Sequence, residues 1–196
     1  MNKLKAFLMA ALLAVGVSAQ AEVVKVHTKG QYAYASYYTY DGCSYESTYV
    51  SASEMKDPGT SNTLYVYAGV YKYNYCTGSY QYGYGYTTAD PADLKVAGNK
   101  ATIKTTVPLN YYYGGGVGST LTIDLTFIAN GEWTSQGHSN YHYDTPTYRY
   151  MSRYVGSDKS ADVTGSVSDG TTEFAVGASM YGYIGKSNSG YIQHTQ

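Results

Sequence analysis

Tyrosine at every second position constrains this chain more than any other feature of its sequence. In the segment YKYNYCTGSYQYGYGY, residues 71–86, tyrosines alternate with small or polar residues on both sides of a four-residue break. A period of two places these rings on one face of an extended strand, whereas a helix repeats its face every three to four residues. Because apolar residues after residue 21 do not recur at helical spacing over three turns, few and short helices are expected.

The tyrosine hairpin has a register that its loop predicts. If Cys76 to Ser79 form a four-residue loop, the rings face one another in three pairs. The pairs are Tyr75 with Tyr80, Tyr73 with Tyr82 and Tyr71 with Tyr84, and these six residues are called the tyrosine ladder below. Upstream, an apolar row from Leu64 to Val70 occupies the face opposite Tyr65 and Tyr67. Either the strand bulges near Gly69 and swaps faces, or the ladder stays exposed; the sequence leaves both open.

Two further hairpins are predicted by glycine-containing turns. Gly98-Asn99 suits a two-residue turn, because glycine accepts a positive φ. Its register pairs Val96 with Ala101 and Leu94 with Ile103. Asp169-Gly170 predicts a second hairpin, in which a glycine opposite a phenylalanine leaves room for the ring. That register pairs Val167 with Thr172, Gly165 with Phe174, Val163 with Val176 and Ala161 with Ala178.

The remaining alternating segments indicate an all-β antiparallel fold. In residues 119–128 an apolar row of Leu121, Ile123, Leu125 and Phe127 alternates with threonine and aspartate, which is typical of a strand buried on one side. Counting QYAYASYYTY, residues 31–40, and several shorter segments, we expect roughly eight to ten strands. An antiparallel β-sandwich is the expected architecture, and a β-barrel is the alternative.

The first 21 residues predict export. Lys3 and Lys5 precede an apolar run that ends in Ala19-Gln20-Ala21, the pattern of a secretory signal peptide. The run is too short for a membrane anchor, so the protein is expected to be secreted or periplasmic and not an integral membrane protein. Residues 22–196 then form one all-β domain. This part has more acidic than basic residues and no basic block, which argues against nucleic acid and anionic lipid as partners.

Cys43 and Cys76 are the only cysteines of the chain. An oxidising compartment favours their pairing into one structural disulfide. A free nucleophile or a metal thiolate is the alternative, but no C-x-x-C motif and no Cys/His cluster supports it.

Few residues suggest catalysis or metal binding. On a strand, His138, His142 and Asp144 point the same way, although the roughly 13 Å between the two histidines is long for one metal ion. Glu132 beside Trp133 suggests a glycan cleft, but it lacks a second carboxylate. The glycine-rich segment at residues 111–120 precedes a strand and is interpreted as a flexible hairpin loop. No catalytic residue, metal or cofactor is therefore assigned.

The excess of tyrosine favours a binding or structural role. The chain has 27 tyrosines, and after residue 21 its only phenylalanines are Phe127 and Phe174. A core needs no hydroxyls, so rings with polar edges indicate contact with water or a partner, such as a glycan or a surface protein. An ordinary half-buried sheet face explains the spacing equally well. A secreted hydrolase of envelope or extracellular polymers and a self-assembling matrix subunit are alternative functions.

Three segments resemble a loose group of secreted bacterial β-rich proteins. They are DGCSYESTYVSA (41–52), YKYNYCTG (71–78) and GSVSDGTTEFAVGASMYGYIGKSNSG (165–190). The shared motifs are G-C-x-Y, Y-x-Y-C-x-G and a C-terminal G-x-V-x-D-G hairpin. The resemblance implies secretion and a β-rich fold but no activity, since none is known for the group.

Overall fold

The computed structural model describes residues 22–56, 62–113, 119–170, 172–174 and 181–195. The expected signal peptide lies outside these ranges. Within them no helix is long and apolar enough to cross a membrane. The elements are the strands β1 (Glu22–Tyr40), β2 (Ser44–Lys56), β3 (Thr63–Asn74), β4 (Tyr80–Ala89), β5 (Leu94–Ala97), β6 (Lys100–Tyr113), β7 (Thr120–Ala129), β8 (Thr134–Thr145), β9 (Tyr148–Ser168), β10 (Glu173–Phe174) and β11 (Tyr181–Thr195), and the short 3-10 helix η1 (Pro91–Asp93).

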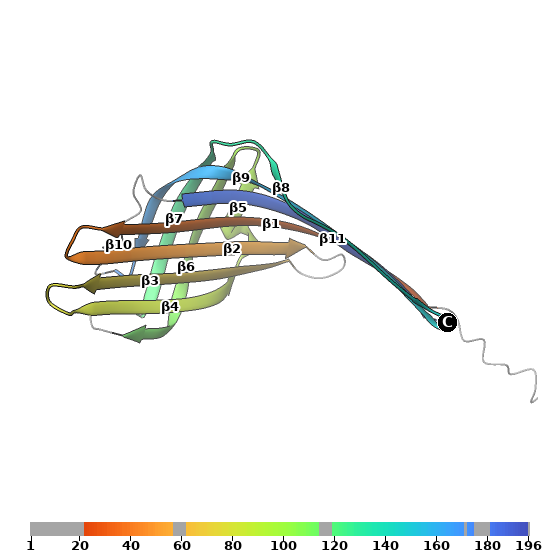
Figure 1. The fold of residues 1–196 in the computed structure, drawn as a ribbon, viewed down its shortest axis with the longest axis horizontal. Coiled ribbons are helices and arrows are strands. Elements are labelled where there is room, and N and C mark those ends of the chain that lie inside the picture. Colours follow the sequence, from red (N-terminus) through yellow and green to blue (C-terminus); the bar gives the residue numbers. More distant parts are fainter. Residues whose placement is uncertain (1–21, 57–61, 114–118, 171, 175–180, 196) are drawn as a thin grey trace, which may run out of the picture.

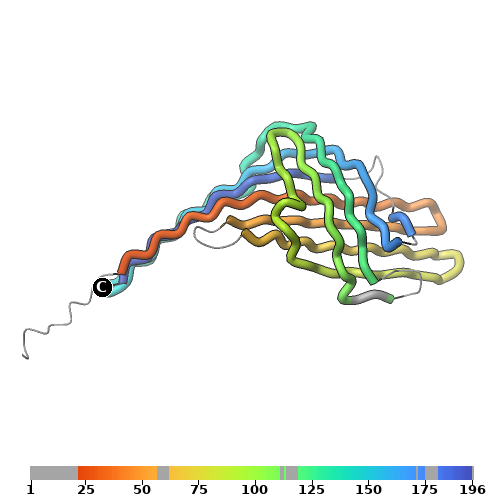
Figure 2. Tube along the Cα trace, turned by 180° about the vertical axis from the view of Figure 1, so that it is seen from behind, coloured from red at the N-terminus to blue at the C-terminus, as the bar shows by residue number. Residues whose placement is uncertain are grey.

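The described strands form two layers that are joined on both sides. One layer contains β1 to β4, and β6 and β7 cross it at a steep angle with the C-terminal half of β9 (Figures 1 and 2). Antiparallel pairing runs from β9 through β11, β1, β2, β3, β4, β6 and β7 back to β9. The predicted all-β antiparallel fold is therefore confirmed. The strands number eleven in the described ranges, slightly more than expected.

Apolar side chains of the two layers meet between them. Small residues such as Ala33 and Ala52 come from the first layer, and Phe127 and Leu125 come from the second, all buried. Small side chains opposite large ones let the layers approach and interdigitate. The buried row from Leu121 to Phe127 confirms the one-sided strand that alternation predicts in this segment.

The predicted hairpin registers have mixed outcomes. Around Gly98-Asn99 every predicted pair is confirmed, and Gly98 has a φ of 61°. Around Asp169-Gly170 the predicted register is wrong by two residues, because Phe174 pairs with Val167 and not with Gly165. The Asp169 carboxylate accepts a hydrogen bond from the Thr172 backbone N–H at 2.6 Å, which widens the turn. The predicted partners Val176 and Ala178 lie outside the described residues.

A narrow arm leaves the body of the molecule. It consists of β8, the N-terminal halves of β9 and β1, and the C-terminal half of β11, and it projects far beyond the two layers (Figures 1 and 2). Its strand order is β8-β9-β11-β1. None of the described residues forms a second layer over the arm, so within these ranges both of its faces are open.

Candidate functional site

The tyrosine ladder lies on the outside of the body. On β3 the residues Leu64, Val66, Ala68 and Val70 face the core, and the tyrosines alternate outward without a swap of faces. On β4 the inward positions are Gly83 and Gly85, which are buried. The core side of this hairpin thus consists of aliphatic side chains on β3 and of glycine backbone on β4, and the tyrosine rings lie on the outside. Of the two possibilities that the sequence leaves open, the exposed ladder is the one observed.

The register within the ladder differs from the predicted one by two residues. Tyr73 pairs with Tyr80, Tyr71 with Tyr82 and Gly69 with Tyr84, whereas Tyr75 lies in the turn. The Asn74 side chain accepts hydrogen bonds from the backbone N–H groups of Cys76 and Thr77, both at 2.9 Å, and so builds a longer turn. A shift by two keeps every ring on its predicted face.

The ladder is only part of a much wider aromatic surface. Ser51 of β2 pairs with Tyr34 on one side and with Tyr67 on the other, so neighbouring strands add their outward tyrosines to the same face. Tyr37 is the exception on β1, because it points inward and is 8% exposed. The outer tyrosine face, as we call it, spans β11, β1, β2, β3, β4 and β6. Its members are Tyr32, Tyr34, Tyr38, Tyr40, Tyr45, Tyr49, Tyr65, Tyr67, Tyr71, Tyr73, Tyr80, Tyr82, Tyr84, Tyr86, Tyr113, Tyr181 and Tyr183.

Two rings of this face lie over glycines of a neighbouring strand. A Cβ added to Gly69 would come within 2.2 Å of the Tyr49 ring, and one added to Gly185 within 2.0 Å of the Tyr32 ring. A ring in this position occupies the space above the backbone that the glycine leaves free. Burial, and then the neighbouring Tyr82, raise the pKa of the Tyr49 hydroxyl. Tyr49 is therefore central to the surface, although no alternating tyrosine row in its own strand marks it in the sequence.

Other rings of the face pack side by side. Tyr80 and Tyr113 stack at 4.9 Å with an interplanar angle of 12°, and Tyr34 and Tyr183 stack at 5.0 Å and 21°. Such pairs contribute about 0.5–1.5 kcal/mol each beyond the burial of their area. The rings therefore support one another across strands, which gives the surface a fixed shape.

Tyr32 should make the protein sensitive to alkaline pH. Burial first, and then the charge of Asp158, raise the pKa of Tyr32 from 10.0 to about 12. Between about pH 10 and pH 12 the unfolded chain loses this proton before the folded chain does, so the free energy of unfolding falls as the pH rises. We expect Tyr32→Phe to make this fall shallower in denaturant titrations at several pH values. Tyr38→Phe, on the same strand and face, is the control, and equal slopes for both variants would contradict the assignment.

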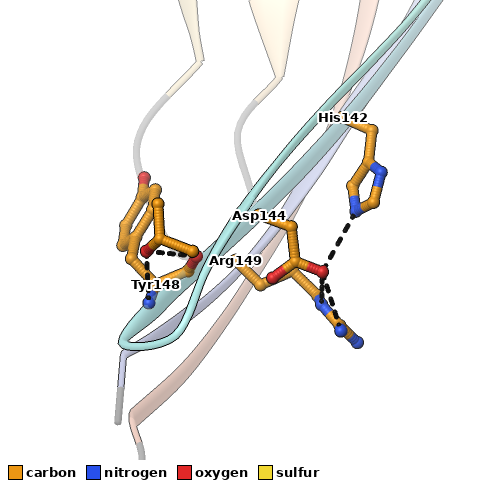
Figure 3. A network of polar contacts seen from close by, with 5 residues as sticks. His142, Asp144, Tyr148 and Arg149 are labelled. Atoms are coloured by element: carbon orange, nitrogen blue, oxygen red, sulfur yellow. Dashed lines mark hydrogen bonds and ion pairs between the residues drawn. The ribbon is translucent and has the colours of Figure 1, made fainter.

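The three residues considered for metal binding share one face of β8, but the Asp144 carboxylate is paired with Arg149. His138, His142 and Asp144 all lie on one face of β8. The Asp144 carboxylate binds Arg149 at 2.9 Å and lies 3.8 Å from His142 (Figure 3). Among the described residues no group of three or more His, Cys, Asp or Glu side chains is placed to hold a metal ion. Asp144 thus forms an ion pair with Arg149 beside the turn that joins β8 to β9 at the end of the arm.

Two lysine ammonium groups lie near the ring of Trp133. The ammonium groups of Lys159 and Lys186 are 5.1 Å and 5.7 Å from the centre of its ring. Lys159 is buried and also donates a hydrogen bond to Asn99 at 2.8 Å. These contacts anchor the indole where the arm joins the body. Glu132, the neighbouring carboxylate, is exposed.

Fold and site define an all-β protein with a broad aromatic outer face. No family model matches this chain, and no curated protein matches it. Among solved structures, a protein from Nitrosomonas europaea described as a "putative AttH" is similar over 88% of this chain and 52% of its own, with 10% identity and a TM-score of 0.27. The chain spans about half the length of that protein. A similarity this low supports neither a fold assignment nor a function.

Proposed function

We propose that the protein is an exported, non-catalytic binding protein whose outer tyrosine face binds a glycan of the cell surface. The observation that carries the proposal is the position of Tyr49. Its ring lies over Gly69 and the residue is 40% exposed, with Tyr82 and Tyr84 beside it. A partly exposed ring that rests on backbone offers a surface on which a sugar ring stacks, and the surrounding hydroxyls supply hydrogen bonds.

Rigidity supports binding by this face. The rings are held by cross-strand contacts and by glycines beneath them, so a ligand would order few additional side chains. Tyrosine also provides a large contact area with little conformational entropy to lose. The disulfide between Cys43 and Cys76 agrees with export to an oxidising compartment.

The proposal is tested by removing the central rings. We expect the protein from residue 22 onward to co-sediment with insoluble polysaccharides or host envelope, and Tyr49→Ala with Tyr84→Ala to weaken this binding about tenfold, as expected for two lost stacking contacts. Tyr49→Phe with Tyr84→Phe keeps the rings and separates stacking from hydrogen bonding. Tyr141→Ala with Tyr143→Ala removes two exposed arm tyrosines as the matched control.

The outcomes separate the proposal from its alternatives. Equal binding by the wild type and the folded Tyr49, Tyr84 variant would overturn the proposed site. Release of soluble sugars from the polymer would favour the hydrolase instead. Growth of particle mass with concentration in light scattering, without polysaccharide, would favour the matrix subunit.

A further inference from the structure

The two faces of the arm differ in chemistry. Direct partners in an antiparallel sheet share a face, so the registers assign each side chain of the arm to one side. One face continues the outside of the body and carries six tyrosines, Tyr141, Tyr143, Tyr148, Tyr150, Tyr154 and Tyr191. The other face continues the core side, and we call it the basic face. There the aliphatic residues of the body give way to polar and positively charged ones.

All four histidines of the chain lie on the basic face. They are His27 on β1, His194 on β11, and His138 and His142 on β8. The same face carries Lys25, Lys29, Arg149 and Arg153. Asp144 is its one carboxylate within the described arm, and it is bound to Arg149.

The basic face is hollowed along its middle. A groove of about 940 Å³ crosses the four strands. In one row Lys25, Ile192, Met151 and His142 lie side by side, and in the next His27, Gly190, Arg153 and Asn140. The floor is therefore formed by Ile192, Met151 and the bare backbone of Gly190. Lys25 and His27 on β1 and His142 on β8 form the walls, and Arg153 on β9 adds a further cation to the lining.

We propose that this groove binds a linear acidic polysaccharide whose sugars carry carboxylates. Charge complementarity carries the inference, because Lys25, Lys29 and Arg153 have no ion-pair partner among the described residues. Such a chain is narrow and has charged edges and apolar pyranose faces. Its carboxylates meet the walls of the groove, and its pyranose faces pack on Ile192 and Met151.

Other polyanions match the groove less well. Grooves that bind single-stranded nucleic acid combine positive charge with stacking aromatic rings. Here the registers assign the six tyrosines of the arm to the opposite face, and of these only Tyr141 and Tyr191 also border the groove. An anionic bilayer presents a broad surface, which would contact the walls and leave the floor empty. Nucleic acid and membrane are therefore outcomes of the test.

Binding to the groove should depend on the fixed cations of this face. Lysine and arginine are charged throughout the ordinary pH range, and Asp144 offsets the charge of Lys25, Lys29, Arg149 and Arg153 only in part. Because ions in solution screen exposed charge pairs, we expect polygalacturonate to bind more weakly as the salt concentration rises.

The experiment measures binding of the protein from residue 22 onward to immobilised polygalacturonate at low salt. Lys25→Ser with Arg153→Ser should weaken binding about tenfold. Lys95→Ser with Lys100→Ser removes two exposed cations of the body and should change nothing. Neutral dextran, duplex DNA and anionic phospholipid vesicles serve as comparison probes.

Several results would overturn the inference. Equal binding by wild type and the Lys25, Arg153 variant would remove the groove from consideration. Tighter binding to DNA or vesicles than to polygalacturonate would identify a different partner. Because the tyrosines of the body are untouched in these variants, loss of acidic-polymer binding with retained binding by the outer tyrosine face would separate the two sites.

Discussion

Gly165→Ala is expected to lower the free energy of unfolding by more than about 3 kcal/mol, or to prevent folding. Gly165 has a φ of 126°, where side chains are strained, and an added Cβ would lie 2.0 Å from the Asp124 carbonyl oxygen. The obstacle is backbone, so no side-chain rotation relieves it. Gly165 pairs with Leu125 where β7 meets β9, and this pairing completes the circuit of strands. A displaced β9 would also disturb the buried Phe127 and Val163.

Gly170→Ala is the matched control for this prediction. Gly170 has a φ of 85°, but nothing lies within 4 Å of an added Cβ, so only backbone strain of about 1–2 kcal/mol is expected. Denaturation in guanidinium chloride, followed by tryptophan fluorescence, measures both variants. If Gly165→Ala costs no more than Gly170→Ala, the close approach of β7 and β9 is not a constraint on folding.

The local sequence predicts which face of a strand each residue occupies better than it predicts the registers of the hairpins. The register around Gly98-Asn99 is predicted correctly because these two residues alone form the turn between the two strands. The registers near Asn74 and Asp169 were wrong by two residues, because each side chain accepts hydrogen bonds from backbone N–H groups beyond it and lengthens its turn. An error of two residues in the register leaves every residue on its predicted face of the strand. The predictions of which residues share a face, in the apolar rows and in the tyrosine row, are therefore confirmed.

The role of Gly165 also shows where local reasoning fails. The sequence suggested that this glycine makes room for Phe174. In the structure Phe174 lies opposite Val167, and the glycine is required by the approach of β7. β7 belongs to a separate segment, and pairing between distant segments leaves no local signal.

The candidate surfaces depend on the same long-range pairing. Tyr49 lies among the ladder rings because β2 pairs with β3, whereas the ladder alone was visible in the sequence. The basic face takes its residues from four strands at alternate positions, so each strand contributes only one to three basic side chains. For that reason the sequence contains no basic block, and these side chains come together only in the folded chain.

Replacement of both Cys43 and Cys76 by serine is expected to lower the free energy of unfolding by about 3–4 kcal/mol. The disulfide that the sequence predicted is present, with a sequence separation of 33 residues and a Cα–Cα distance of 5.4 Å. It joins the β1–β2 turn to the β3–β4 turn. In the chain-entropy model the bond acts by restricting the unfolded chain, and the folded turns keep other contacts. The Asp41 carboxylate still accepts a hydrogen bond from the Ser44 N–H at 2.7 Å, and the Tyr75 N–H still donates to the Cys43 carbonyl.

Guanidinium denaturation of the wild type with and without reductant provides the control. The reduced wild type should match the double-serine variant, and the variant should not respond to reductant. Because the native turns are retained, the folded variant should also keep its binding by the outer tyrosine face. A variant as stable as the oxidised wild type would mean that the turns and the strand circuit restrict the chain without the bond, and the stabilisation would then lie in the turns at Asp41 and Asn74.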